Sequence, residues 1–308
     1  MPSVPHYTPI SYTGSDGLAL YARDYAAAGP DTASSSGAAA LAGAAAARLP
    51  VICIHGLTRN SADFDEFAPI VAGLGRRVLA LDVRGRGESA RDPDLEHYTP
   101  QVYADDVEAL MDRLGIARAV FVGTSMGGLI TMTLAARKVE RIAAAVLNDI
   151  GPVISHKGLE RIAAYVGRQS RPATWEEAAA AIKDINACAF PGLDDADWDK
   201  WARRAFAPDA SGRLALRYDP GIAKAMQTGK LRTSSPGLRK GFRRLAQSCP
   251  VLLVRGQLSD LLEPRQADWM RRQAPGMAVV EVPGVGHAPM LTEPEALAAI
   301  TRFLATVP

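Results

Sequence analysis

Three features are scarce in this chain of 308 residues: cysteine, an excess of one charge, and long apolar runs. Its three cysteines, Cys53, Cys188 and Cys249, are far apart and form no CxxC pair, so the sequence indicates neither a disulfide framework nor a zinc site. Lys and Arg number 35 against 33 Asp and Glu, a formal net charge of +2. Because this charge creates no strong field, we expect neither nucleic acid nor a membrane as a partner.

Targeting and cofactor signatures are also missing. The first ten residues, MPSVPHYTPI, contain no basic segment followed by an apolar one, so we expect no signal peptide and a cytoplasmic location. The chain contains no HExxH, no GxxxxGK(S/T), and no GxGxxG between an early strand and a helix. We therefore expect neither a metal nor an organic cofactor.

From residue 51 onward the chain repeats one unit, a short apolar run followed by a turn and then a segment of helical period. The runs are VICIH (51–55), RVLALD (77–82), AVFVG (119–123), AAAVLND (143–149), PVLLVRG (250–256) and AVVEV (278–282). Runs without alternation are typical of strands covered on both faces. The pattern predicts an α/β fold with a mostly parallel, doubly wound sheet.

Two segments stand apart from this repeat near the N-terminus. Residues 10–13 and 18–25, joined by GSDG, predict a β-hairpin. The alanine- and glycine-rich segment 34–47 is too short to span a bilayer and is interpreted as an insertion before the next strand.

The repeat is interrupted between the fourth and fifth runs by roughly a hundred residues, whereas a crossover needs only a dozen or so. Helix-like stretches occur there: GLERIAAYVGRQ, TWEEAAAAIKDINACAF and DADWDKWARRAF. We therefore predict a helical cap insertion at 152–235, with 1–151 and 236–308 forming the core. Its aromatic side chains are candidates either for pocket walls or for the core of the cap: Tyr165, Trp175, Phe190, Trp198, Trp201 and Phe206.

Polar residues follow the ends of the predicted strands, where ligands bind in open α/β sheets. They are His55, Asp82, Ser125, Asp149, Asp260 and His287. Ser125 lies in GTSMG (123–127), which matches the G-x-S-x-G turn that raises a nucleophilic serine above the sheet. The amides that follow it, at a helix N-terminus, would face an oxyanion. His287, in a glycine-rich loop, can reach over the sheet edge as general base.

Four further motifs surround the serine in order: HGLTRN (55–60), DVRGRGES (82–89), RGQLSD (255–260) and GVGHAPMLTEPE (284–295). With them the chain resembles the cap-bearing, esterase-like branch of the α/β-hydrolase superfamily over most of its length. The resemblance implies a triad in the chain order Ser125, Asp260, His287. It also implies oxyanion-hole amides at Leu57 and Met126, with His55 supporting the loop.

Two other acids compete with Asp260 for the place beside His287. Asp82 begins a motif that is usually a structural turn in the resembled family, and Asp149 occupies an acid position used by some relatives. RGxxSD recurs in the family as the acid loop, so we predict Asp260, with Asp149 at the cap entrance instead.

The resemblance implies a cofactor-free serine hydrolase that cleaves a small-molecule carboxylic ester or lactone through an acyl-enzyme. Dehalogenases and epoxide hydrolases of this fold carry aspartate where this chain has serine. Alternatives are hydrolysis of a carbon–carbon bond in a ring-cleavage product, where Arg59 could bind a dienoate, and perhydrolysis or halogenation by relatives that usually lack a cap. A ligand-binding receptor on the hydrolase fold is a further alternative.

Overall fold

A computed structural model describes residues 7–28, 48–168, 170–227 and 233–308. The alanine- and glycine-rich segment 34–47 lies outside the described residues. No helix within the described ranges is both long and apolar enough to cross a membrane.

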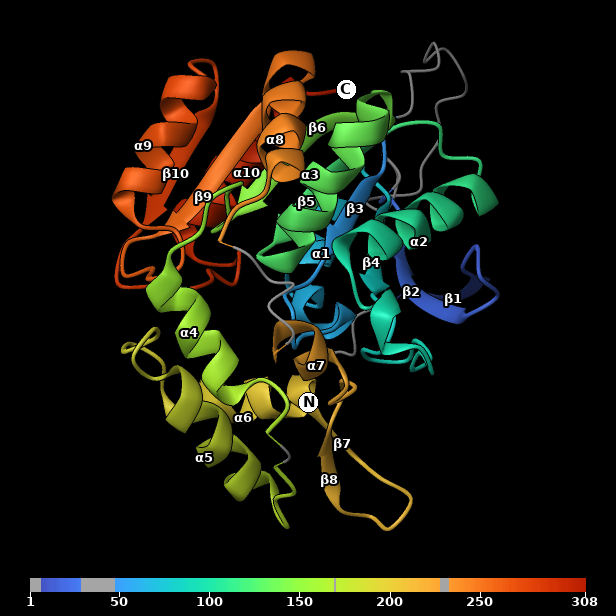
Figure 1. Ribbon diagram of the computed structural model, residues 1–308, viewed down its shortest axis with the longest axis vertical. Coiled ribbons are helices and arrows are strands. Elements are labelled where there is room, and N and C mark those ends of the chain that lie inside the picture. Colours follow the sequence, from blue (N-terminus) through green and yellow to red (C-terminus); the bar gives the residue numbers. More distant parts are fainter. Residues whose placement is uncertain (1–6, 29–47, 169, 228–232) are drawn as a thin grey trace, which may run out of the picture.

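A single sheet of eight strands organises the described core (Figure 1). Its order is β1-β2-β4-β3-β5-β6-β9-β10. The bounds are β1 Thr8–Thr13, β2 Ala19–Tyr25, β3 Val51–Ile54, β4 Val78–Asp82, β5 Ala119–Thr124, β6 Ile142–Asn148, β9 Val251–Gly256 and β10 Ala278–Val282. The strands β4, β3, β5, β6, β9 and β10 are parallel, and the hairpin β1-β2 joins the edge at β4 antiparallel. The predicted hairpin, strands and α/β class are confirmed.

Helices cover both faces of the sheet. On one face lie α2 Pro100–Arg113, α3 Met126–Lys138, α8 Pro236–Ser248 and α9 Pro264–Gln273; on the other lie α1 Phe67–Gly73 and α10 Pro294–Thr306. Short 3-10 turns are η1 Ser61–Phe64, η2 Leu95–His97 and η3 Val139–Arg141. In β3, Ile52 and Ile54 pack on the first face while Val51 and Cys53 pack on the second. Burial on both faces explains the absence of alternation in the strand sequences.

The segment between β6 and α8 forms a separate group of elements beyond the carboxyl ends of the strands (Figure 1). It contains α4 His156–Tyr165, α5 Trp175–Asn186, α6 Asp195–Ala205, the hairpin β7 Phe206–Pro208 and β8 Leu214–Leu216, and α7 Ile222–Gln227. A small apolar core of its own includes Trp198, Trp201 and Phe190. The three expected helices are present, whereas the hairpin was not predicted because its strands have only three residues each. The limits 152 and 235 stay a prediction.

Helices α3 and α8 approach closely at a glycine. A Cβ atom added to Gly241 would lie 1.9 Å from the carbonyl oxygen of Met132. Because that oxygen belongs to the backbone of α3, the contact can be relieved only by separating the two helices.

We expect Gly241→Ala to lower the free energy of unfolding by about 1–3 kcal/mol, the usual cost of overpacking a closely packed interface. Gly237→Ala in the same helix is the matched control, because Gly237 is exposed and its added Cβ would meet only Ser235 Oγ at 3.8 Å. Alanine favours helix over glycine, so the control should be neutral or stabilising. Urea denaturation of both variants measures the difference, and equal effects would contradict the proposed close contact.

Candidate active site

Ser125 lies in the sharp turn between β5 and α3, with φ 51° and ψ −111°. This left-handed backbone is strained for a residue with a side chain. The flanking glycines permit it, because a Cβ on Gly123 would lie 2.5 Å from the carbonyl carbon of Gly127 and one on Gly127 would lie 2.1 Å from the Ile54 carbonyl oxygen. The spacing of the G-x-S-x-G motif is thus explained by the close approach of β3, β5 and α3.

Ser125, His287 and Asp149 form a hydrogen-bonded relay. Ser125 Oγ is 2.8 Å from His287 Nε2, and His287 Nδ1 is 2.7 Å from Asp149 Oδ2. Asp149 is completely buried, and the His287 side chain is 8% exposed. A carboxylate at Nδ1 holds the proton on that nitrogen and leaves Nε2 as an acceptor for the serine hydroxyl. This arrangement can activate Ser125 as a nucleophile.

The prediction that Asp260 contacts His287 is wrong in this structure. Both carboxylate oxygens of Asp260 accept hydrogen bonds from Arg161 of α4, at 2.6 Å from Nε and 2.9 Å from Nη2. Burial raises the pKa of Asp260, but the hydrogen bonds and charge of Arg161 outweigh it and hold the pKa below its usual value. Asp260 therefore joins α4 to the loop after β9. The expectation that Asp149 lies at the cap entrance is wrong as well, because Asp149 is buried and contacts His287.

The carboxylate of Asp149 is fixed from three directions. Its Oδ1 accepts a hydrogen bond from the Gly256 amide at 2.9 Å, and its Oδ2 accepts one from Ser259 Oγ at 2.5 Å in addition to His287. Asp149 itself has a left-handed backbone, with φ 54°. In the RGQLSD motif, Gly256 and Ser259 thus contact the acid beside His287, whereas Asp260 does not.

Asn148, which the sequence reasoning did not identify, links the serine turn to the histidine loop. Its amide nitrogen donates to Thr124 Oγ1 at 3.0 Å and to the Pro289 carbonyl at 2.7 Å. Its own carbonyl accepts from the Ser125 amide at 3.0 Å. The only signal in the sequence was its place at the end of the strand next to β5.

Two backbone amides, those of Leu57 and Met126, are the expected oxyanion donors. Met126 is the first residue of α3, where amides point out of the helix. Leu57 lines the cavity that also contains Ser125, and its carbonyl accepts a hydrogen bond from Arg86 Nε at 3.0 Å. Among the described residues, neither amide has a hydrogen-bond acceptor outside its own helix or loop. Their role as an oxyanion hole stays a prediction.

His55 is buried below this loop and contacts the backbone on both sides. Its Nδ1 lies 2.7 Å from the Gly56 carbonyl, and its Nε2 accepts from the Val83 amide at 3.1 Å. Burial lowers the pKa of His55 to about 4, so the ring is neutral at pH 7. These contacts agree with a role in supporting the loop.

Asp82 is fully buried away from His287 and serves as an acceptor for backbone amides. It accepts from the Ser61 amide at 2.6 Å and from the Glu88 amide at 2.8 Å. The structural turn predicted for this motif is therefore present. The arginines of the motif pair elsewhere: Arg84 with Asp106, for example, and Arg86 with carbonyl oxygens and Tyr103.

A cavity of about 360 Å³ is lined by Ser125 and His287 together with residues of the insertion. Its apolar lining includes Phe64, Ile162, Tyr165, Ile182, Trp201, Phe206, Leu216 and Tyr218. Of the six aromatic candidates, Tyr165, Trp201 and Phe206 line the cavity, whereas Trp198 and Phe190 pack against Trp201 in the core of the insertion. Trp175 packs under the guanidinium of Arg203.

Arg59 also lines the cavity, but its charge is already engaged. Its Nε and Nη2 donate to the two oxygens of Asp63, both at 2.7 Å, and the guanidinium lies 4.3 Å from the centroid of the Trp201 ring. The pair presents little net charge to a ligand. This finding weakens the sequence-based suggestion that Arg59 binds a dienoate.

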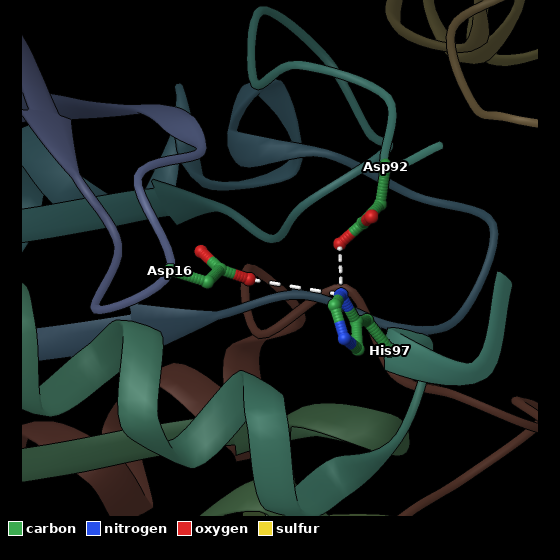
Figure 2. Close-up of side chains that lie close together, drawn as sticks. All are labelled: Asp16, Asp92 and His97. Carbon is green, nitrogen blue, oxygen red and sulfur yellow. Dashed lines mark hydrogen bonds and ion pairs between the residues drawn. The ribbon is translucent and has the colours of Figure 1, made fainter. Parts of the chain in front are cut away.

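A second polar cluster, shown in Figure 2, brings together Asp16, Asp92 and His97. His97 Nδ1 is 3.0 Å from Asp92 Oδ2 and 3.7 Å from Asp16 Oδ2. The buried guanidinium of Arg84 donates to the same two oxygens, at 2.5 Å and 2.7 Å. Because Arg84 joins both carboxylates and also Asp106, while His97 contacts Asp92, these residues form a structural ion-pair network.

Comparison with known proteins agrees with the fold. The alpha/beta hydrolase fold family matches residues 50–294. A crystal structure of an alpha/beta hydrolase from Novosphingobium aromaticivorans is 40% identical, with a TM-score of 0.87 over 98% of this chain and 99% of that one. The chain belongs to the α/β-hydrolase family.

Two curated relatives are hydrolases by name. A 3-hydroxybutyrate-oligomer hydrolase of Cupriavidus necator is 35% identical over 257 residues, which are 82% of this chain and 87% of that protein. A 2-(acetamidomethylene)succinate hydrolase of Mesorhizobium japonicum is 28% identical over 259 residues, with the same coverage of 82% and 87%. These relatives support a hydrolase acting on a small molecule.

The buried neutral ring of His55 predicts a pH-dependent stability. Its pKa in the folded state, about 4, lies below the ordinary value of about 6.5. Between these values the unfolded chain binds more protons, so stability is complete above pH 6.5 and decreases as the pH falls toward 4. From pH 7.5 to pH 5 this single group should cost about 2 kcal/mol.

This contribution is isolated by measuring the free energy of unfolding at both pH values for three proteins: the wild type, His55→Gln and His156→Gln. His156 is the matched control because 76% of its side chain is exposed. We expect a smaller decrease between the two pH values for His55→Gln than for the other two proteins. An identical decrease in all three would contradict a neutral His55.

Proposed function

We propose that this protein is a serine hydrolase that cleaves a carboxylic ester through an acyl-enzyme and needs no cofactor. Ser125 is the nucleophile, His287 the general base and Asp149 the acid that orients the histidine. The observation that carries the proposal is the unbroken relay of hydrogen bonds from Asp149 through His287 to Ser125. Ser125 and His287 also line a cavity. The complete relay favours catalysis over ligand binding alone.

In the first half of the reaction, Ser125 Oγ attacks the ester carbonyl while its proton passes to His287 Nε2. The amides of Leu57 and Met126 stabilise the resulting oxyanion, and each such donor contributes about 3–4 kcal/mol in a characterised enzyme of this kind. Asp149 stabilises the imidazolium without becoming protonated. His287 then gives the proton to the departing alcohol, leaving an acyl group on Ser125.

In the second half, a water molecule takes the place of the alcohol. It transfers a proton to His287 Nε2 as its oxygen attacks the acyl carbonyl, and the same two amides stabilise the second oxyanion. Collapse of this intermediate releases the carboxylic acid and returns the proton to Ser125. Water and ester are thereby converted to an acid and an alcohol.

The cavity supports a small substrate with apolar parts. Its volume of about 360 Å³ is at the lower end of ligand sites, which occupy roughly 300–1,000 Å³. The named substrate of the C. necator relative is an oligomer of 3-hydroxybutyrate, in which hydroxy acids are joined by ester bonds. We propose a short ester of this chemical class and keep a lactone as the alternative.

Residues 152–235 act in this proposal as the cap that sets what enters. The cavity that contains Ser125 and His287 is also lined by Tyr165 of α4, Ile182 of α5 and Trp201 of α6. A cover of this kind limits the access of water until the substrate is bound. Hydrolysis of a carbon–carbon bond is less well supported, since Arg59 is paired with Asp63.

Ser125→Ala should lower kcat for an aryl ester of a short acid by at least about a thousandfold, as expected when a nucleophile is removed. Ser211→Ala is the control, because Ser211 lies in the exposed turn between β7 and β8 and does not line the cavity. Steady-state hydrolysis and a thermal melt should be measured for both. Activity of Ser125→Ala within tenfold of the wild type would rule out the assigned nucleophile.

Asp149→Asn and Asp260→Asn form a matched pair that tests the acid. Loss of the tautomer partner costs roughly ten-thousandfold in kcat in a characterised triad, so Asp149→Asn should be nearly inactive. Asp260→Asn should keep kcat within a few-fold, because its carboxylate binds Arg161. The reverse ranking, with both variants folded by circular dichroism, would restore Asp260 as the acid.

A further inference from the structure

A smaller cavity of about 110 Å³ adjoins the one that contains Ser125. The two cavities share four lining residues: Arg168, Ser170, Leu216 and Tyr218. Arg91 and Arg171 complete the polar wall of the smaller cavity. A ligand that reaches past Leu216 and Tyr218 from Ser125 therefore meets three arginines.

The positive charge of this smaller cavity is largely uncompensated. All three arginines are exposed to solvent, and among the described residues the guanidinium groups of Arg91 and Arg168 have no hydrogen-bond or ion-pair partner. Arg171 Nη1 lies 3.7 Å from Asp209 Oδ2, beyond hydrogen-bond distance. The other oxygen of Asp209 already accepts hydrogen bonds from Ser211 and from the Arg213 amide.

Acidic groups of the larger cavity do not cancel this charge. Asp63 is bound by Nε and Nη2 of Arg59, and the exposed Asp184 of α5 lines the larger cavity but not the smaller one. Tyr218, at the boundary of the two cavities, accepts a hydrogen bond from the Gly167 amide. Its hydroxyl hydrogen has no acceptor among the described residues and is available to an anion.

We propose that Arg91, Arg168 and Arg171 form a subsite for a free carboxylate of the substrate. The proposal rests on the serine-esterase function above and narrows it to esters whose alcohol part carries a carboxylate. Guanidinium groups match the two oxygens of a carboxylate and keep their charge at all working pH values. The ester carbonyl then lies at Ser125 while the carboxylate of the departing hydroxy acid lies at Arg168.

This placement agrees with the chemistry of the reaction. The acyl–oxygen bond breaks, the acyl group is transferred to Ser125 and then to water, and the alcohol oxygen receives the proton from His287. The product released from the arginine side is a hydroxy acid, and the product released from Ser125 is the second acid. In a linear ester of two hydroxy acids, the free carboxylate belongs to the alcohol part, as the subsite requires.

The test compares two substrates that differ only in this charge, 3-acetoxybutyrate and 3-acetoxybutyramide. Each contains one ester bond, and only the first has a carboxylate. We expect the wild type to prefer the acid, and Arg168→Gln and Arg91→Gln each to lower kcat/KM for the acid by about tenfold through KM, as for loss of a hydrogen bond to a charged group. For 3-acetoxybutyramide, kcat/KM for cleavage of the ester bond should stay within twofold of the wild-type value in both variants.

Arg113→Gln is the matched control, since Arg113 is exposed at the end of α2 and lines neither cavity. The subsite would be overturned if the wild type had equal kcat/KM for the two substrates. It would also be overturned if the arginine variants lost kcat/KM equally for both. Failure of the wild type to cleave either substrate or an aryl ester would instead count against the serine-esterase function.

Calorimetry on Ser125→Ala separates the two proposals, because it measures binding without turnover. The variant should bind 3-acetoxybutyrate more tightly than the amide, and the additional change Arg168→Gln should remove the preference. Equal affinities for acid and amide in Ser125→Ala would refute the subsite whether or not the enzyme cleaves esters.

Discussion

Ser125 can keep its left-handed backbone only because three backbone segments meet around it without side chains between them. A single residue in this conformation costs of the order of 1–3 kcal/mol, and the packing of β3, β5 and α3 must offset that cost. Gly123 and Gly127 allow the approach, since a Cβ at either position would overlap backbone atoms. The same turn exposes the serine hydroxyl to the cavity and places the Met126 amide at the N-terminus of α3. The geometry of the proposed chemistry thus depends on packing beneath it.

Strand β6 connects this turn to the other two members of the relay. It lies between β5 and β9, so the residues at its end face the serine on one side and the loops after β9 and β10 on the other. Asn148 binds Thr124 and the Pro289 carbonyl, and the next residue, Asp149, binds His287 and the Gly256 amide. Two consecutive residues therefore hold the histidine loop in register with the nucleophile. Buried hydrogen bonds of this kind hold both side chains in place, although Asn148 Oδ1 has no hydrogen-bond partner among the described residues.

Much of this arrangement could be predicted from the sequence, because a buried parallel strand has a distinctive apolar composition and its end is marked by a turn. The strands, the serine turn and His287 follow from local pattern. The acid does not, since Asp149 and Asp260 both follow buried strands and differ only in what packs against them. The partner of Asp260 is Arg161, which is about a hundred residues away in the chain. The aromatic residues of the insertion could not be sorted from the sequence for the same reason. Trp198 and Trp201 lie on the same helix, α6, yet Trp201 lines the cavity and Trp198 lies in the interior.

The position of α4 explains how the insertion and the core can act on one substrate. Gly158 lets this helix approach the backbone of Asp260, where an added Cβ would lie 2.6 Å from its carbonyl oxygen, and Arg161 binds the carboxylate of the same residue. Beyond the end of α4 at Tyr165, Arg168 lies at the boundary of the two cavities. The contact at Asp260 therefore attaches α4, the helix that precedes Arg168, to the loop after β9. Asp260 thus joins the insertion to the core, whereas in the proposed mechanism the buried carboxylate of Asp149 orients His287.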